Sequence, residues 1–328
     1  KALKSRAFFK STLSAARVMA TKAKIYIDGQ AGTTGLEITQ RLRARDDLEL
    51  LYLDDTNRKD PVARQAQLQA ADISILCLDD EIARQAVELA AGQCRLLDAS
   101  TAHRVDPNWA YGLPELSSSQ RVLIKEPMQV SNPGCYPQGF ILLIRPLIEA
   151  GLLSPTVALR CHAVSGYSGG GRKMIEAHQA FNSAEAEALN SQVYALGLAH
   201  KHVPEMQTYS LTETRPLFTP TVANYYRGML VQIPLFIEEL NGTERATVHS
   251  CLHNTYQHEA FIDVLPLSND GYVNPTACNG SNRIELMVFG NDQQVLLAAR
   301  YDNLGKGAAG AAVQNLNLML GIGEDTSL

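Results

Sequence analysis

Cys135 is the residue of this chain whose neighbours best suit a nucleophile. It lies in the segment VSNPGCYPQGF, residues 130–140, among turn-forming prolines and glycines. The residues that follow have helical spacing, and Pro137 falls in the first turn, where proline is tolerated. A thiol at a helix N-terminus is favoured as the thiolate, the form that attacks carbonyl groups. The alternative is a buried, unreactive thiol, for which Cys77 in the apolar run ISILCLDD is the example.

A thiolate nucleophile needs a base or a cationic partner. The segment AHKHVPEMQ offers His200 and His202, and Glu205 follows three residues later, where it can orient an imidazole. If this segment is extended, alternation turns only one of the two histidines toward a given face. The same His-x-His pair suits a metal ion, but no third ligand cluster accompanies it. We therefore expect an acid/base pair and no metal site.

A glycine-rich turn near the start of the chain predicts a dinucleotide site. The segment DGQAGTTG places Gly29, Gly32 and Gly35 between a strand-like run and a helical run. Glycine lets the backbone approach a pyrophosphate, and the helix N-terminus offers free N–H groups to it. Thr33 and Thr34 can add hydroxyl contacts to the phosphates. The alternative is a plain structural turn.

The residues after the second strand-like run give conflicting indications about the cofactor. Asp54 and Asp55 lie about 20 positions after the glycines, where an acidic residue commonly holds the ribose of NAD. Arg58 and Lys59 follow directly, and basic residues there hold the 2′-phosphate of NADP. A solvated charged loop is the third interpretation. These residues alone do not choose between the two cofactors.

The elements that must position these residues divide into two kinds. From residue 24 to about 134, continuous apolar strands alternate with helices, which is typical of an α/β unit with a Rossmann-like parallel sheet. Beyond about residue 150, strand-like runs alternate with irregular stretches, which predicts an α+β unit with a mixed or antiparallel sheet. A helix rich in small residues ends the chain and is expected to pack back on the first unit. The predicted division is an N-terminal extension at 1–20, a cofactor domain at 21–134 completed by 303–328, and a catalytic domain at 135–302.

Composition excludes several classes of protein. The chain has 328 residues, of which 19% are charged, and a formal net charge of −5, so it lacks the basic footprint of a nucleic-acid binder. No apolar run reaches the ~18–20 residues of a membrane helix. The six cysteines include no C-x-x-C pair, and a chain of this length without an apolar signal sequence favours reduced thiols.

The first 27 residues contain no Asp or Glu and carry seven Lys and Arg residues. This composition is compatible with an organelle transit peptide. We favour a leader, or an upstream extension before a natural start at Met19, and expect a cytoplasmic protein, with organelle import left open.

Five motifs, taken together and in this order, resemble one family. They are YGLPEL at 111–116, SNPGCYP at 131–137, VSGYSGGGR at 164–172, HKHVPE at 200–205 and DNLGKGAAGAAVQNLN at 302–317. From about Lys24 to its end, the chain resembles the N-acetyl-γ-glutamyl-phosphate reductases, in their shorter, type 2 variety. The family pattern more often has threonine where this chain has Gln138.

The resemblance implies a semialdehyde-dehydrogenase-like enzyme. It would use NADPH to reduce N-acetyl-L-glutamyl 5-phosphate to the 5-semialdehyde in arginine biosynthesis, releasing inorganic phosphate, as a homodimer or tetramer. Cys135 would form the thioester. His202 would act as acid/base, with His200 as the alternative base or a substrate contact, and the glycine turn would carry the NADP phosphates. The remaining residues implied are Asn303 at the cofactor, Arg104 at the substrate phosphate or carboxylate, and Arg172 as a weaker anion contact.

Three other functions compete with this one. Aspartate-semialdehyde dehydrogenase shares the chemistry and differs in substrate. A cysteine–histidine acyltransferase or hydrolase needs the thiol but no dinucleotide, and a dinucleotide-sensing protein needs the cofactor but no reactive thiol. Neither of the last two needs the glycine turn, the cysteine loop and the HKHVPE segment together.

Overall fold

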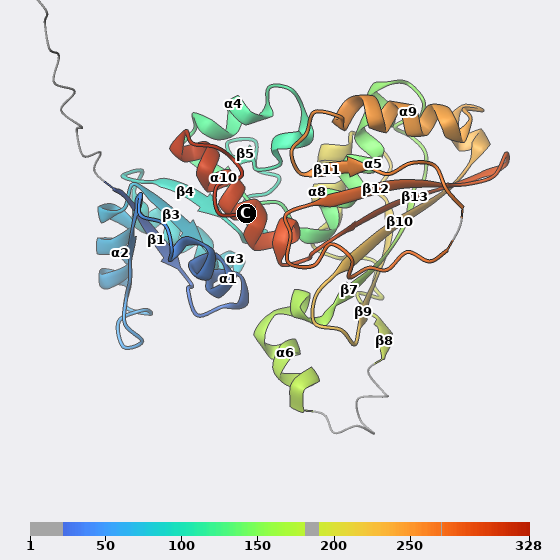
Figure 1. The fold of residues 1–328 in the computed structure, drawn as a ribbon. Helices are drawn as coiled ribbons and strands as arrows, with labels where there is room; N and C mark the ends of the chain where they lie inside the picture. The colour runs from blue at the N-terminus through green and yellow to red at the C-terminus, as the bar shows by residue number, and fades with distance from the viewer. Residues whose placement is uncertain (1–21, 181–189, 270) are drawn as a thin grey trace, which may run out of the picture.

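The computed structural model describes residues 22–180, 190–269 and 271–328, and its elements fall into two groups (Figure 1). The predicted N-terminal extension, residues 1–20, lies outside the described residues. In the described chain, no helix is both long and apolar enough to cross a membrane.

The first group is a six-stranded parallel sheet with the order β2-β1-β3-β4-β6-β5. The elements before residue 135 are β1 (Ala23–Asp28), α1 (Thr33–Leu42), β2 (Leu48–Leu51), α2 (Pro61–Ala70), β3 (Ile73–Leu76), α3 (Asp80–Ala90), β4 (Arg95–Asp98), β5 (Ala110–Tyr111), the 3₁₀ turn η1 (Pro114–Leu116), α4 (Gln120–Lys125) and β6 (Gln129–Ser131). Side chains alternate along the strands, so Ile25 and Ile27 face one core while Tyr26 faces the other. The predicted parallel sheet, covered on both faces, is confirmed.

The second group is a seven-stranded mixed sheet with the order β11-β12-β13-β10-β7-β9-β8. Its elements are α5 (Cys135–Glu149), β7 (Arg160–Gly166), the 3₁₀ turn η2 (Tyr167–Gly170), α6 (Gly171–Ala180), β8 (Ser191–Val193), α8 (Val203–Ser210), β9 (Leu217–Ala223), β10 (Met229–Phe236), the 3₁₀ turn η3 (Ile237–Leu240), α9 (Arg245–Tyr256), β11 (Ile262–Val264), β12 (Ile284–Gly290) and β13 (Gln294–Tyr301). The β7/β9 and β11/β12 pairs are parallel and the other pairs antiparallel. The prediction of a mixed or antiparallel sheet is therefore met by a mixed one.

The largest core lies between this mixed sheet and the helices α5, α8 and α9. Helix α5 contributes the continuous run FILLI, residues 140–144, all of it fully buried. A helix that is apolar on most of its faces belongs in a core, and here it is held between the sheet and its neighbouring helices. Cys135 is the first residue of this rigid element, because Gly134 is its N-cap.

The chain ends with a π-helical turn, Gly305–Ala309, followed by α10 (Gly310–Leu320). Figure 1 shows this red segment lying back against the blue and cyan elements of the first sheet. Val313 and Leu316 of α10 share a core with Ile38 and Leu42 of α1. The final helix thus completes the cover of one face of the first sheet. The domain boundaries given above stay predictions.

Candidate active site

A cavity of about 420 Å³ lies where the two sheets meet, and it contains most of the residues selected from the sequence. Its wall is formed by both groups of elements and by the C-terminal π-turn. The predicted residues that line it are Thr33, Thr34, Arg104, Cys135, His200, His202 and Asn303. Segments far apart in the chain therefore supply one concave site, as a substrate pocket requires.

Cys135 lies at the start of α5, as its neighbours predict, and its side chain is half-buried in this cavity. The Arg104 guanidinium and the N–H groups of Tyr136 and Cys135 itself favour the thiolate. Burial opposes them and has the larger effect, raising the pKa of the Cys135 thiol to about 11. The expectation of a lowered thiol pKa at the helix start is therefore wrong for this structure. The dipole and cation contributions exist, but desolvation outweighs them.

Two histidines line the same cavity, whereas an extended segment would have turned only one of them toward it. The segment around His200 is a turn leading into α8 rather than an extended strand, and the His202 N–H donates to His200 Nδ1 at 3.1 Å. The two imidazole rings lie 4.7 Å apart, centre to centre. A turn does not follow the twofold alternation of a strand, so both rings point inward.

Both imidazoles are held neutral. Burial, followed by repulsion from Lys201 and Arg104, lowers the pKa of His200 to about 4. Burial, followed by the Arg104 charge, lowers the pKa of His202 well below its usual range. A neutral imidazole can accept a proton from a thiol, and the same cavity holds the protonated thiol and both neutral imidazoles.

Glu205 organises the cysteine loop. Its Oε1 accepts hydrogen bonds from the Gly134 N–H and the Tyr111 hydroxyl, both at 2.7 Å. Its Oε2 forms a buried ion pair with Arg104 at 3.2 Å. Among the described residues, neither His200 nor the His202 imidazole is its hydrogen-bond partner, so the prediction that Glu205 orients an imidazole is not met.

Gly134 marks the point where these groups converge. A Cβ built on it would lie 2.5 Å from Arg104 Nη1, 2.7 Å from His202 Nε2 and 2.9 Å from Glu205 Oε2. Any side chain at this position would collide with all three groups. Glycine beside Cys135 therefore lets the guanidinium, the imidazole and the carboxylate approach the thiol loop.

The glycine turn after β1 has the geometry of a phosphate cradle. Gly29 has a φ of +92°, and a Cβ on it would lie 2.2 Å from the Cys77 carbonyl oxygen. A Cβ on Gly35 would lie 2.5 Å from the Gly29 carbonyl oxygen. Gly32 is the N-cap of α1, whose first residues Thr33 and Thr34 line the cavity that holds Cys135. The free N–H groups of this helix start fit the pyrophosphate of a dinucleotide.

A second cavity, of about 490 Å³, lies on the other side of the same turn. It is lined by Gly29, Arg58 and Lys59, together with the buried ion pair of Arg64 and Asp28. Arg58 also pairs with the exposed Asp55 at 3.2 Å. The turn thus separates a cavity with basic residues from the cavity with the thiol, and a dinucleotide laid across the turn has a place for each end.

Two family models match the chain in the order of its two sheets. One, described as "Semialdehyde dehydrogenase, NAD binding domain", matches residues 24–123, and the other, described as "Semialdehyde dehydrogenase, dimerisation domain", matches residues 135–303. A protein named N-acetyl-gamma-glutamyl-phosphate reductase 2 from Pseudomonas putida is 49% identical over 90% of this chain and 96% of its own length. One of the same name from Nostoc sp. is 46% identical over 94% of this chain and 99% of its own.

The chain belongs to the N-acetyl-γ-glutamyl-phosphate reductase family. A relative from Brucella suis, named N-acetyl-gamma-glutamyl-phosphate reductase, is 47% identical over 92% of this chain and 99% of its own. The fold is shared more widely: a crystal structure of aspartate semialdehyde dehydrogenase II from Vibrio cholerae matches 92% of this chain and 99% of its own, with a TM-score of 0.68 and 17% identity. That likeness concerns the fold alone.

Two of the predicted contacts of this reductase-family chain have other partners in the structure. Arg172 is exposed on α6, pairs with Glu176 at 2.7 Å and does not line the cavity. Asn303 lines the cavity, but its amide accepts from the Gly228 N–H at 2.8 Å and donates to the Ser168 hydroxyl at 2.9 Å. Asn303 therefore joins the start of β10 to the loop after β7, on the wall of the cavity.

Several residues of the site had no role assigned from the sequence. Tyr111 holds Glu205, and Lys201 adds positive charge beside both histidines. Tyr194 lines the cavity and donates to the Tyr136 hydroxyl at 3.1 Å. Tyr111 belongs to the motif YGLPEL, which was one of the five motifs, so the motif was a signal but the role was not visible in it.

Proposed function

We propose that this chain reduces N-acetyl-L-glutamyl 5-phosphate to N-acetyl-L-glutamate 5-semialdehyde with NADPH, in arginine biosynthesis. The observation that carries the proposal is the shared cavity: the Cys135 thiol, a neutral His202 and the start of α1 at the glycine turn all reach it. The names of the relatives at 46–49% identity support the same substrate. The nearest alternative is aspartate 4-semialdehyde as the aldehyde, with unchanged chemistry.

The first step makes a thioester on the enzyme. His202 accepts the proton of the Cys135 thiol, and the sulfur forms a bond to the carbonyl carbon of the acyl phosphate. The bond from that carbon to the phosphate oxygen breaks, and inorganic phosphate leaves. We assign to Arg104, whose guanidinium lies beside the loop and lines the cavity, the role of meeting the negative charge of the phosphate or of the substrate carboxylate.

The second step reduces the thioester. When bound, NADPH supplies the hydride that converts the thioester carbon to the oxidation level of the aldehyde. His202, now protonated, returns its proton to the oxygen of the hemithioacetal or to the departing sulfur. The semialdehyde is then released and Cys135 regains its starting state. His200 lines the same cavity and is the alternative proton carrier or a substrate contact.

The nicotinamide cofactor fits the glycine turn, and we assign it as NADP(H) rather than NAD. Arg58 and Lys59 in the second cavity supply the positive charge that a 2′-phosphate requires. Asp55 is paired with Arg58 in the free protein, and a phosphate would compete for the same guanidinium. We propose no metal for the reaction; in the described chain no group of three or more His, Cys, Asp and Glu is arranged to hold one.

The ligands, the oligomeric state and the cellular location of the enzyme belong to the same proposal. Its partners are the acyl phosphate, the semialdehyde and inorganic phosphate, and it assembles as a homodimer or tetramer, in keeping with the match to a dimerisation domain. It binds neither nucleic acid nor membrane, and it works in the cytoplasm.

The test is the reverse reaction, in which the semialdehyde is oxidised to the acyl phosphate by NADP in the presence of inorganic phosphate. We expect Cys135→Ser to lose at least about 10³-fold in rate, because the nucleophile is removed. Cys251→Ser, a half-buried cysteine on α9, is the matched control and keeps the wild-type rate. Near-normal phosphate-dependent activity in Cys135→Ser would refute the mechanism. If aspartate 4-semialdehyde is turned over faster than N-acetylglutamate 5-semialdehyde, the proposed substrate is wrong. Equal rates with NAD and NADP would contradict the assignment of NADP as the cofactor.

A further inference from the structure

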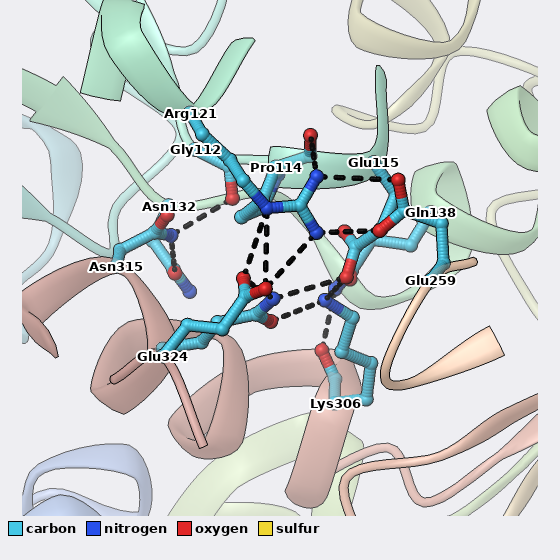
Figure 2. Close-up of polar contacts among 11 residues, drawn as sticks. Gly112, Pro114, Glu115, Arg121, Asn132, Gln138, Glu259, Lys306, Asn315 and Glu324 are labelled. Carbon is cyan, nitrogen blue, oxygen red and sulfur yellow. Dashed lines mark hydrogen bonds and ion pairs between the residues drawn. The ribbon is translucent and has the colours of Figure 1, made fainter. Parts of the chain in front are cut away.

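Lys306 and Glu115 form a completely buried charged pair, whose polar contacts Figure 2 shows. Lys306 Nζ lies 2.7 Å from Glu115 Oε1, and both side chains have no exposed surface. Gln314 joins them, since it accepts a hydrogen bond from Lys306 and donates one to Glu115 Oε1 at 3.0 Å. The desolvation cost of such a pair can exceed the attraction between its members. Stability alone is therefore a weak reason for placing it here.

Lys306 belongs to the π-turn Gly305–Ala309 that forms part of the cavity wall. The turn closes with hydrogen bonds across five residues, from the Gly307 N–H to the Asp302 carbonyl and from the Ala309 N–H to the Leu304 carbonyl, each at 3.0 Å. Single π-helical turns within or beside α-helices are rare and are found frequently at functional sites.

The π-turn lies directly against the nucleophile. A Cβ built on Gly307 would lie 3.2 Å from the Cβ of Cys135, so backbone and thiol residue are packed together. Gln138, one turn further along α5, donates from its amide to the Lys306 carbonyl at 2.7 Å. Asn132, at the other end of the cysteine loop, donates to the Ala308 carbonyl at 3.1 Å. The turn is thus tied to the loop on both sides of Cys135.

The Lys306 side chain itself does not reach the reaction. It is fully buried, is not among the residues that line the cavity, and points to Glu115 in the η1 turn, 191 positions earlier in the chain. Burial by itself raises the pKa of Glu115, but the attraction of Lys306 and the hydrogen bonds from Lys306 and Gln314 outweigh it, so the pKa of this carboxyl lies below its ordinary value. The ion pair therefore joins the π-turn to the η1 turn and fixes the position of the π-turn.

We infer that Lys306 is a positioning residue for the proposed reaction: its ion pair with Glu115 holds the π-turn against Cys135 and so sets the orientation and shielding of the thiol. The reaction in this statement rests on the proposed function, whereas the positioning of the thiol does not. Without this ion pair, the π-turn beside Cys135 becomes more mobile. The thiol is then more accessible to small reagents, and its alignment with the acyl carbon is lost.

The experiment uses the full chain with Lys306→Met and Glu115→Gln combined, which removes both charges and keeps the shapes, so that no lone charge stays buried. The control is Arg160→Met with Glu239→Gln, an ion pair at the start of β7. Ser165 of the same strand lines the cavity, and five residues of strand place Arg160 about 16 Å from it. For each variant we measure kcat, the KM for NADP and the thermal midpoint of unfolding. We also measure the rate at which iodoacetamide alkylates Cys135, following the Cys135 peptide by mass spectrometry.

For the Lys306/Glu115 variant we expect kcat to fall at least about tenfold with the KM for NADP within about twofold, and Cys135 to be alkylated several times faster than in the wild type. The control should match the wild type in both. A role limited to stability would lower the thermal midpoint and leave kcat per folded enzyme and the alkylation rate unchanged, and that result would overturn the inference.

A second variant keeps the inference testable if the double variant does not fold. Gln138→Leu removes the tie between α5 and the Lys306 carbonyl without burying an unpaired charge. We expect the same two changes, smaller in size, and unchanged values of both would overturn the inference. The alkylation rate needs no substrate, so if the wild type shows no reductase activity the proposed function fails, and the alkylation results still decide whether Lys306 positions Cys135.

Discussion

Two opposing effects set the pKa of the Cys135 thiol. The start of α5 and the Arg104 guanidinium favour the thiolate, while burial favours the thiol and raises its pKa to about 11. His202 is neutral because burial and the Arg104 charge both oppose its protonation. With the thiol pKa raised, the proton stays on sulfur at neutral pH, and the neutral His202 of the same cavity is the proposed acceptor. This differs from a preformed thiolate–imidazolium pair and makes proton transfer part of the attack.

That protonation state predicts the pH dependence of Cys135 in the free protein. Below a pKa of about 11, the thiolate fraction grows tenfold with each pH unit, so alkylation by iodoacetamide should keep accelerating from pH 7 to pH 10. An ordinary thiol, with a pKa of about 8.5, would approach its plateau by about pH 9.5. Modification of the Cys135 peptide, followed by mass spectrometry, measures the profile. A plateau below pH 8 would show a preformed thiolate instead.

Glu205 carries a stability prediction at the same scale. Replacing it with Gln removes the negative charge that faces the buried Arg104 and weakens the bond from the Gly134 N–H. Breaking a buried ion pair from one side costs about 3–5 kcal/mol, so Glu205→Gln should lower the free energy of unfolding by that order. The comparison is Glu149→Gln, whose partner Arg145 lies one helical turn away on the surface and where about 0.5 kcal/mol is expected. Denaturant titrations measure the free energy of unfolding of both variants, and equal losses in the two would contradict this account.

At the scale of elements, the site depends on two chain segments that approach unusually closely. Helix α5 presents Cys135 at its first residue, and the π-turn before α10 supplies the backbone that covers it. Glycine at position 307 faces Cys135, whereas Gly305 and Gly310 let the π-turn approach the loop before β12: a Cβ on Gly305 would lie 2.3 Å from the Ser281 carbonyl oxygen, and one on Gly310 would lie 2.1 Å from Asn282 Oδ1. The part of the cavity wall that the π-turn supplies is therefore glycine-rich backbone, with little room for larger side chains.

Gly307 offers the sharpest test of that packing. Its Cβ would lie 3.0 Å from the Asp302 carbonyl oxygen and 3.2 Å from the Cβ of Cys135, so Gly307→Ala must displace one or the other. Overpacking of this kind costs about 1–3 kcal/mol, and we expect kcat/KM to fall at least about tenfold. Gly197→Ala meets no atom within 4 Å and serves as the control, with activity and stability unchanged. Wild-type kinetics in Gly307→Ala would refute the close packing at Cys135.

At the scale of the whole molecule, both sheets are joined by segments that cross between them. The chain returns after β13 so that α10 packs with α1 over the first sheet. Arg227, in the loop before β10, pairs with Glu37 of α1 at 3.3 Å and with Asp302, after β13, at 3.3 Å. The glycine turn and the cysteine loop are therefore held in one rigid arrangement, as the proposed reaction between two bound molecules requires.

The returning helix makes the stability of the first sheet depend on the last residues of the chain. Leu316 of α10 is fully buried with Ile25 and Ile38, so Leu316→Ala should lower the free energy of unfolding by about 2–5 kcal/mol. Leu123→Ala, at an exposed position of α4, should change it by about 0.5 kcal/mol or less. Urea unfolding followed by circular dichroism measures both. Similar small losses in the two variants would mean that α10 contributes little to this core.

Local patterns were sufficient for the first sheet and for the cysteine, histidine and glycine segments that meet in the cavity; the helices α6, α8 and α9, where irregular stretches were expected, were missed. The alternation of apolar strands with helices predicts the parallel sheet, because each strand is buried on both faces by its own neighbours in sequence. Turn-forming residues followed by helical spacing predict that Cys135 begins a helix, and the glycine spacing predicts the turn before α1. These are short-range properties, and they hold wherever the segment lies in the molecule.

The electrostatic state of the site was decided by the tertiary structure. The pKa of Cys135 depends on how much of the thiol is desolvated, and the partners of Glu205 depend on which loops pack against it, so both predictions differed from the structure. Arg172 and Glu176 pair on an exposed face of α6, away from the cavity that Arg172 was expected to reach. The Lys306–Glu115 pair joins residues 191 positions apart, and neither residue drew attention by itself. The sequence by itself determined the elements and the chemical groups; their charges and partners depend on burial and on contacts between distant segments, which only packing creates.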